Sequence, residues 1–143
     1  MRRGGPAIVG LLVLLLAVVG RLLPSGAPGP VEDGTDALRS AYEAKAHELQ
    51  VRGEGRVVRV LADDRDGSRH QRFVLRTGDG LTVLVAHNID LAPRIPRLAQ
   101  GDHVRFHGAY VWNDQGGVIH WTHHDPAGRH AGGWLEHEGV RYE

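Results

Sequence analysis

From Val51 to the end of the chain, apolar and polar residues alternate with a period of two, and short glycine-rich turns interrupt the alternation. Successive side chains of a β-strand point to opposite faces, so this pattern predicts strands rather than helices. The clearest case is His103–Trp112, where Val104, Phe106 and Tyr110 fall on one face. The alternation restricts the chain to a small, mainly β architecture.

Five main strands are expected within a domain over residues 51–143. Turn sequences separate them, the strongest being Thr77-Gly78-Asp79-Gly80, and a longer connection with two prolines follows the third strand. An OB-fold barrel has this order, with a crossing element between its third and fourth strands. We predict a small five-stranded OB-fold-like barrel, with another small barrel or a sandwich as the alternative. The expected strands are Gly55–Leu61, Arg69–Arg76, Leu81–Asn88, His103–Trp112 and Val118–His124.

One helix is expected to precede the barrel, over residues 35–50. Thr35 or Asp36 can cap its start. Because the apolar stripe is narrow, we expect the helix to pack on the surface of the barrel. The stripe consists of Leu38, Tyr42, Ala46 and Leu49.

The first 23 residues have the layout of an export signal. Arg2 and Arg3 precede an unbroken run of apolar residues and glycine over residues 7–20. If the segment is not cleaved, residues 7–23 lie at the lower length limit of a membrane-spanning helix. Residues 1–23 are therefore interpreted as a signal peptide or an N-terminal membrane anchor, and the proline- and glycine-rich residues 24–34 as a linker. The domain is expected outside the cytoplasm, either periplasmic or secreted, or held at the inner membrane by this segment.

Composition excludes several classes of protein. The chain has no cysteine, which excludes disulfides, thiolate metal sites and thiol catalysis. Its 17 basic residues balance its 17 acidic residues. A protein that coats nucleic acid, or a polybasic membrane binder, needs a clear cationic excess. We therefore expect the membrane to be contacted only through the N-terminal segment.

The chain has ten histidines, and two of them lie near the ends of the predicted hairpin. If the turn centres on Gly78-Asp79, His70 faces His87, and such a pair could share a metal ion, a phosphate or a proton. A one-residue bulge would separate the pair, and two solvated histidines are the alternative. The candidate ligand-binding residues are Arg69, His70, Arg72, His87, Asn88, Asp90 and Arg94, together with Trp134, whose ring is expected to be exposed.

A second histidine-rich run follows the last predicted strand. Imidazole and carboxylate ligands without cysteine suit zinc or a similar transition metal. The run lacks a zinc signature such as His-Glu-x-x-His, and structural hydrogen bonding is the alternative role. The candidate metal ligands are His120, His123, His124, Asp125 and His130.

Three motifs are long and unusual, namely Gly67–Phe73, Ala86–Arg94 and Gly117–Pro126. In these motifs the chain resembles an uncharacterised family of small exported bacterial proteins, the domain of unknown function DUF3465. The resemblance covers residues 50–143. The resemblance implies a short secreted or periplasmic protein, and it implies neither an activity nor catalytic residues.

These observations favour a binding module whose polar surface holds an anionic or polar ligand, such as an oligonucleotide or a glycan. One alternative is a metal-dependent hydrolase of the phosphodiesterase type, in which the second histidine-rich run supplies the ligands. Another is a structural or assembly protein of the cell envelope, in which the histidines only form hydrogen bonds. The leading hypothesis assigns a catalytic role to no residue.

Overall fold

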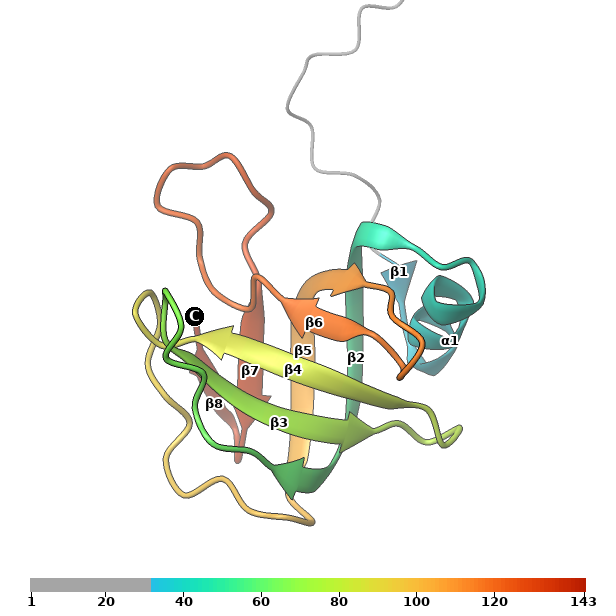
Figure 1. Cartoon of the computed structure of the whole chain (residues 1–143), viewed down its shortest axis with the longest axis horizontal. Coiled ribbons are helices and arrows are strands. Elements are labelled where there is room, and N and C mark those ends of the chain that lie inside the picture. The colour runs from blue at the N-terminus through green and yellow to red at the C-terminus, as the bar shows by residue number, and fades with distance from the viewer. Residues whose placement is uncertain (1–31) are drawn as a thin grey trace, which may run out of the picture.

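The computed structural model describes residues 32–143. The predicted signal or anchor over residues 1–23 lies outside the described residues, as does the predicted linker except for its last three positions. The structure is mainly β, with one short helix before the barrel (Figure 1). Its elements are β1 (Glu32–Asp33), α1 (Thr35–Glu43), β2 (His47–Val60), β3 (His70–Arg76), β4 (Thr82–Asn88), β5 (His103–Val111), β6 (Val118–His120), β7 (Trp134–His137) and β8 (Val140–Tyr142).

Five strands close into a barrel in the order β2-β3-β4-β6-β5, and β5 pairs again with β2. Closure is possible because β2 has 14 residues: residues 47–56 pair with β5, and residues 56–60 pair with β3. The β4–β6 pair is parallel, while the other pairs of the barrel are antiparallel. This arrangement confirms the predicted OB-fold-like barrel, with the long connection between β4 and β5 crossing from one side to the other.

The helix is shorter than predicted. It ends at Glu43, and β2 begins at His47, so the prediction of a helix is wrong for residues 44–50. Lys45 and Glu48 have positive φ angles of 50° and 55°, which a continuous helix does not contain. Ala46 and Leu49 still pack against the core, but from outside the helix. The predicted linker is also shorter, since its residues 32–33 form β1 and pair with β2.

The β3–β4 hairpin has a different register from the predicted one. His70 pairs with Asn88, and Gln71 pairs with His87, so His70 and His87 do not face each other. The cause is the extra residue Gly80, whose φ of 89° places it as a bulge at the end of the turn. A shift of one residue moves the two imidazoles to opposite faces of the sheet.

The last strand of the barrel ends earlier than predicted, at His120 rather than His124. Trp121 has a φ of 51°, which ends the strand and turns the chain into a loop over residues 121–133. This loop projects from the barrel (Figure 1). Beyond it, β7 pairs with the same edge of β5 that β6 left open, and β8 pairs with β7 around the turn at Glu138-Gly139.

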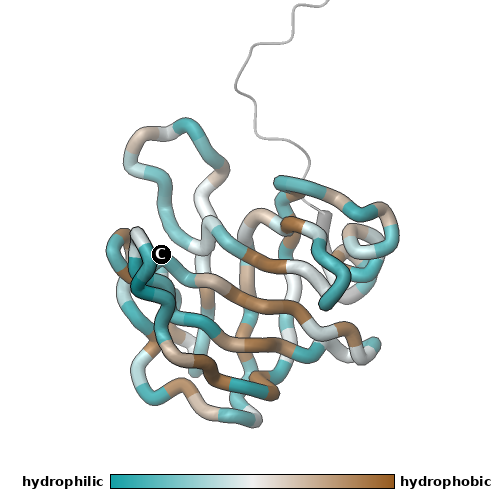
Figure 2. Tube along the Cα trace, viewed as in Figure 1, coloured by the Kyte–Doolittle hydropathy of each residue, from teal (hydrophilic) through white to brown (hydrophobic). Residues whose placement is uncertain are grey.

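The core fills the interior of the barrel. The strands carry most of the strongly apolar segments, which alternate with polar ones, and the loops are mostly polar (Figure 2). Within residues 32–143, no helix has the length and apolar character needed to cross a membrane. The largest fully buried side chains include Tyr110, Phe73, Phe106, Leu38, Leu75, Ile95, Ile119 and Leu135.

Candidate functional site

The predicted ligand-binding residues lie in three places in the structure. Five of them form what we term the corner cluster, where the β2–β3 and β4–β5 connections meet: Arg69, His87, Asn88, Asp90 and Arg94. The other two strand residues, His70 and Arg72, lie on the outer face of β3. Trp134 is elsewhere, on β7.

The charged residues of the corner cluster bind other parts of the chain. The Arg69 side-chain Nε lies 2.7 Å from Asp90 Oδ1, and the Arg69 backbone N–H donates to Asp90 Oδ2. These bonds, the backbone one first, lower the pKa of Asp90. Asn88 accepts the backbone N–H of Asp90, and Arg94 forms an ion pair with Asp63. The cluster therefore fastens the two connections together.

His87 is fully buried and has a partner on each ring nitrogen. Its Nε2 lies 2.9 Å from the Pro93 carbonyl oxygen, and its Nδ1 lies 2.7 Å from the Thr122 hydroxyl oxygen. A carbonyl only accepts, so Nε2 carries the proton and Nδ1 accepts from Thr122. Burial lowers the pKa of His87 to about 4. Neutral His87 thus joins β4 to both the β4–β5 connection and the loop over residues 121–133.

The prediction of an exposed Trp134 is wrong, because only 8% of this residue is accessible. The Arg141 guanidinium lies 4.1 Å from the centre of its ring, and those of Arg105 and Arg52 lie 5.9 Å and 6.0 Å away. Arginine over an aromatic face is a stabilising contact. The cover arises because β7 pairs with β5 and β8, which carry Arg105 and Arg141, and because β2, which carries Arg52, pairs with β5.

The predicted metal ligands have other partners. The Asp125 carboxylate accepts the backbone N–H groups of Ala127, Arg129 and His130, and these bonds, that of Ala127 first, lower its pKa. The His130 ring stacks on Trp121 at 3.9 Å, and His123 Nδ1 lies 2.8 Å from the His124 carbonyl oxygen. Among residues 32–143, no three His, Cys, Asp or Glu side chains are placed to hold a metal ion. His123, Asp125 and His130 thus make their contacts within the loop over residues 121–133, whereas His120 lies on β6 and contacts Glu48.

One cavity lies on the outer face of β3, β4 and β6, and we term it the groove. Its volume is about 340 Å³, and all of its lining residues are half-buried. His70, Arg72 and His120 were singled out in the sequence, although His120 was expected to bind metal. The groove is lined by Asp64, His70, Arg72, Ala86, Val111, Val118 and His120.

The strand register explains the shape of the groove. Arg72 pairs with Ala86 across β3 and β4. On the other side of β4, the parallel register pairs Leu84 with Val118, which brings Ala86 beside His120. A small methyl side chain therefore lies between a guanidinium and an imidazole. The next row is apolar, because Val111 pairs with Val118.

The polar groups of the groove are held in place. Arg72 donates through Nε and Nη2 to the Ala62 carbonyl oxygen, at 3.1 Å and 3.0 Å. These two bonds fix the guanidinium and leave three of its five N–H groups for another acceptor. His120 Nε2 lies 3.1 Å from the Glu48 carboxylate, and His70 Nδ1 lies 2.8 Å from the Ser68 carbonyl oxygen.

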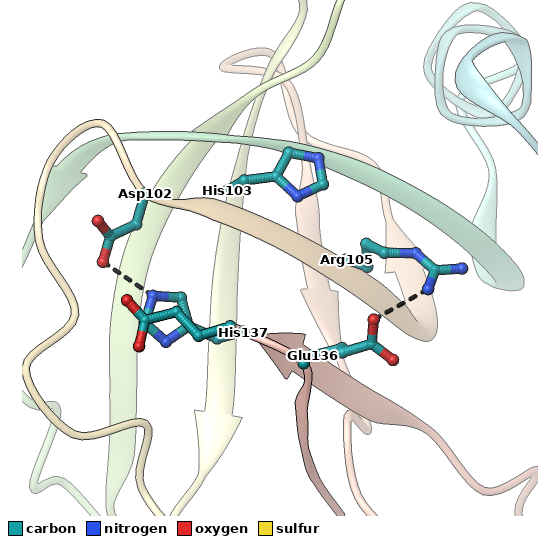
Figure 3. A pocket seen from close by; sticks show the side chains of 7 residues that line it. Asp102, His103, Arg105, Glu136 and His137 are labelled. Carbon is teal, nitrogen blue, oxygen red and sulfur yellow. Dashed lines mark hydrogen bonds and ion pairs between the residues drawn. The ribbon is translucent and has the colours of Figure 1, made fainter.

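A second cavity, of about 280 Å³, lies beside β5 and β7 and was not anticipated from the sequence. Figure 3 shows two polar contacts there: His137 Nε2 lies 2.9 Å from Asp102 Oδ2, and Arg105 forms an ion pair with Glu136 at 2.9 Å. The backbone N–H of Ala99 and then His137 lower the pKa of Asp102. Because these groups bind one another, this cavity offers less to a ligand than the groove does.

Sequence reasoning missed the apolar half of the groove. Ala86, Val111 and Val118 carry no chemistry that draws attention in a sequence. The alternation of side chains along a strand could have identified them, since each is an apolar residue at an outward-facing position of a predicted strand. Asp64 was missed because it lies in a polar turn.

Comparison with known proteins identifies a family for the chain, but the description of that family states no activity. The family described as "Protein of unknown function (DUF3465)" matches residues 22–143. No curated protein matches the chain.

Proposed function

The chain belongs to the DUF3465 family, and since that description carries no activity, we propose a function from the site itself: the protein is a binding module whose groove holds an anionic ligand. The observation that carries the proposal is the row Arg72–Ala86–His120. A hydrogen-bonded guanidinium and an imidazole flank a gap above the Ala86 methyl group.

The Arg72 guanidinium is the feature of the groove that favours an anion, although the lining also includes the Asp64 carboxylate and Glu48 contacts His120. Arg72 is held by a neutral carbonyl oxygen, so its positive charge is not cancelled by that contact. The planar guanidinium fork suits phosphate, sulfate and carboxylate groups, which accept two parallel hydrogen bonds. In the corner cluster, by contrast, Arg69 and Arg94 are each matched by a carboxylate.

The lining also favours a ligand with an apolar part. Val111 and Val118 form the apolar end of the groove, next to the row that carries the charge. Oligonucleotides and anionic glycans both present acidic groups at intervals along a partly apolar chain. A neutral glycan lacks the group that Arg72 would bind, so we propose that it binds more weakly.

The test is a binding measurement on the purified full chain by fluorescence anisotropy. The probes are a labelled single-stranded oligonucleotide, a labelled sulfated glycan and a labelled neutral glycan, at a fixed salt concentration. Arg72→Gln should weaken binding of the anionic probe about tenfold, because a charge-assisted hydrogen bond is lost. Ala86→Leu should weaken it further by filling the gap.

The matched control is Arg69→Gln, which removes the same charge from the corner cluster and should leave the affinity unchanged. An equal loss in Arg69→Gln and Arg72→Gln would show only a long-range effect of charge. Failure of every anionic probe to bind would contradict the proposal.

We also propose that the protein works outside the cytoplasm. The support is the basic start and the apolar run of residues 7–20 in the sequence. Cell fractionation of the full chain tests this, with a variant carrying two arginines within the run as the control. Recovery of both proteins from the cytoplasm would contradict the proposal.

A further inference from the structure

Three side chains that can carry positive charge form one row across β3, β2 and β5. Arg76 pairs with Arg56, and Arg56 pairs on its other side with His103. Residues directly opposite each other on neighbouring strands point to the same face, with Cβ atoms about 4.5–5.5 Å apart. All three residues are exposed. We term Arg56, Arg76 and His103 the arginine row.

A row of this kind is unfavourable by itself. Like charges directly opposite each other destabilise a sheet. Among the described residues, the Arg76 guanidinium has no carboxylate at ion-pair distance, and Arg56 donates to the Gly101 carbonyl oxygen, which leaves its charge in place. Glu54 approaches the row only at His103, at 3.2 Å. Asp79, in the adjoining hairpin turn, is held by Arg39 at 2.8 Å.

The arginine row borders a cavity of about 390 Å³, separate from the groove. This volume falls in the range of small-molecule sites, which is about 300–1,000 Å³. Gly55 lets the strands approach closely here, because a Cβ at this position would lie 2.7 Å from the Arg76 carbonyl oxygen. The remaining lining is Glu54, Gly55, Val58, Thr77 and Gly78.

We propose that this cavity is a second binding site, for a phosphate group carried on a small organic molecule. The phosphate would lie between Arg56 and Arg76, whose guanidinium groups each offer paired N–H donors to it. Its negative charge would remove the repulsion between the two arginines. The organic part would lie toward His103 and the apolar Val58, where the cavity extends beyond the paired arginines.

Isothermal titration of the purified full chain with glycerol phosphate tests the proposal, at constant ionic strength maintained with chloride. We expect saturable binding to one site. Arg76→Gln and Arg56→Gln should each weaken it about tenfold or more, because each removes a charge-assisted donor pair. Inorganic phosphate, the second probe, should bind more weakly than glycerol phosphate because it lacks the organic part.

Arg59→Gln is the matched control, because Arg59 is an exposed arginine of the same strand that does not line the cavity. It should bind glycerol phosphate as the wild type does. Thermal melting without ligand shows whether each variant is folded. No saturable binding by the wild type, or equal weakening by Arg59→Gln and Arg76→Gln, would overturn the proposal. Equal affinity for glycerol phosphate and inorganic phosphate would overturn the claim that the site also binds the organic part of the ligand.

Discussion

The corner cluster and the arginine row are both rich in arginine and histidine, yet they differ in how those residues are paired. In the corner cluster, Arg69 binds Asp90 and Arg94 binds Asp63. In the arginine row, Arg56 and Arg76 lie directly opposite each other. Paired charges hold the chain together, whereas opposed like charges need a partner from outside. The density of polar residues in a sequence is thus a weaker guide to a site than their pairing.

The largest effect on stability is expected from His87→Ala, which removes the buried side chain that links the corner cluster to the loop over residues 121–133. The variant loses two hydrogen bonds and leaves a cavity, so the free energy of unfolding should fall by about 3 kcal/mol. Chemical denaturation measures the change. The exposed His124→Ala is the control and should change stability by less than about 0.5 kcal/mol. A similar loss in the two variants would show that His87 has no special structural role.

Acid should weaken the corner cluster through the same residue. The pKa of His87 is about 4 in the folded protein and 6.5 in an unstructured peptide, so between these values the unfolded state binds more protons. Stability from this group is present above pH 6.5 and is lost as the pH falls toward 4, by up to about 3 kcal/mol. Denaturation at a series of pH values should show this slope in the wild type and not in His87→Ala. The same slope in both proteins would assign it to other groups.

Removing a surface pair of the corner cluster should have a smaller effect. The Arg69 and Asp90 side chains are 58% and 38% exposed, so water screens their attraction. Arg69→Gln should lower the melting temperature only slightly. Thermal melting at low and high salt measures it, and the difference from wild type should shrink at high salt. A fall in melting temperature as large as that of His87→Ala would show that this pair contributes more to stability than a screened surface pair does.

The smallest expected effect has the opposite sign and belongs to the arginine row. Arg76→Gln removes one of two opposed charges, so the ligand-free protein should gain a few tenths of a kcal/mol in stability. The gain should disappear at high salt, where the repulsion is screened. Arg59→Gln should show no such gain. Destabilisation by Arg76→Gln at low salt would indicate that Arg76 has a stabilising contact in the folded protein.

Alternation of apolar residues was enough to predict the barrel, since Val104, Phe106 and Tyr110 are all buried as the period of two requires. It did not locate the end of the helix, because Ala46 and Leu49 keep the helical spacing while the backbone leaves the helix. It also did not fix the hairpin register, which depends on one bulged residue, Gly80.

The candidate site was also predictable only in part, because the sequence does not specify how the strands pair. Arg72, His70 and His120 were identified by their chemistry, but the register that brings His120 beside Ala86 comes from a parallel β4–β6 pair. Such a pair joins segments far apart in the chain, and no local pattern specifies it. His87 was selected for its residue type, and its burial followed from the one-residue shift in the hairpin.

The most direct test of the central claim is a two-dimensional amide NMR spectrum of the full chain, recorded with and without the anionic probe that binds best. The amide signals of Arg72, Ala86 and His120 should shift with ligand, while those of Arg69 and Asp90 stay in place. Shifts confined to the corner cluster, with the groove unchanged, would contradict the central claim.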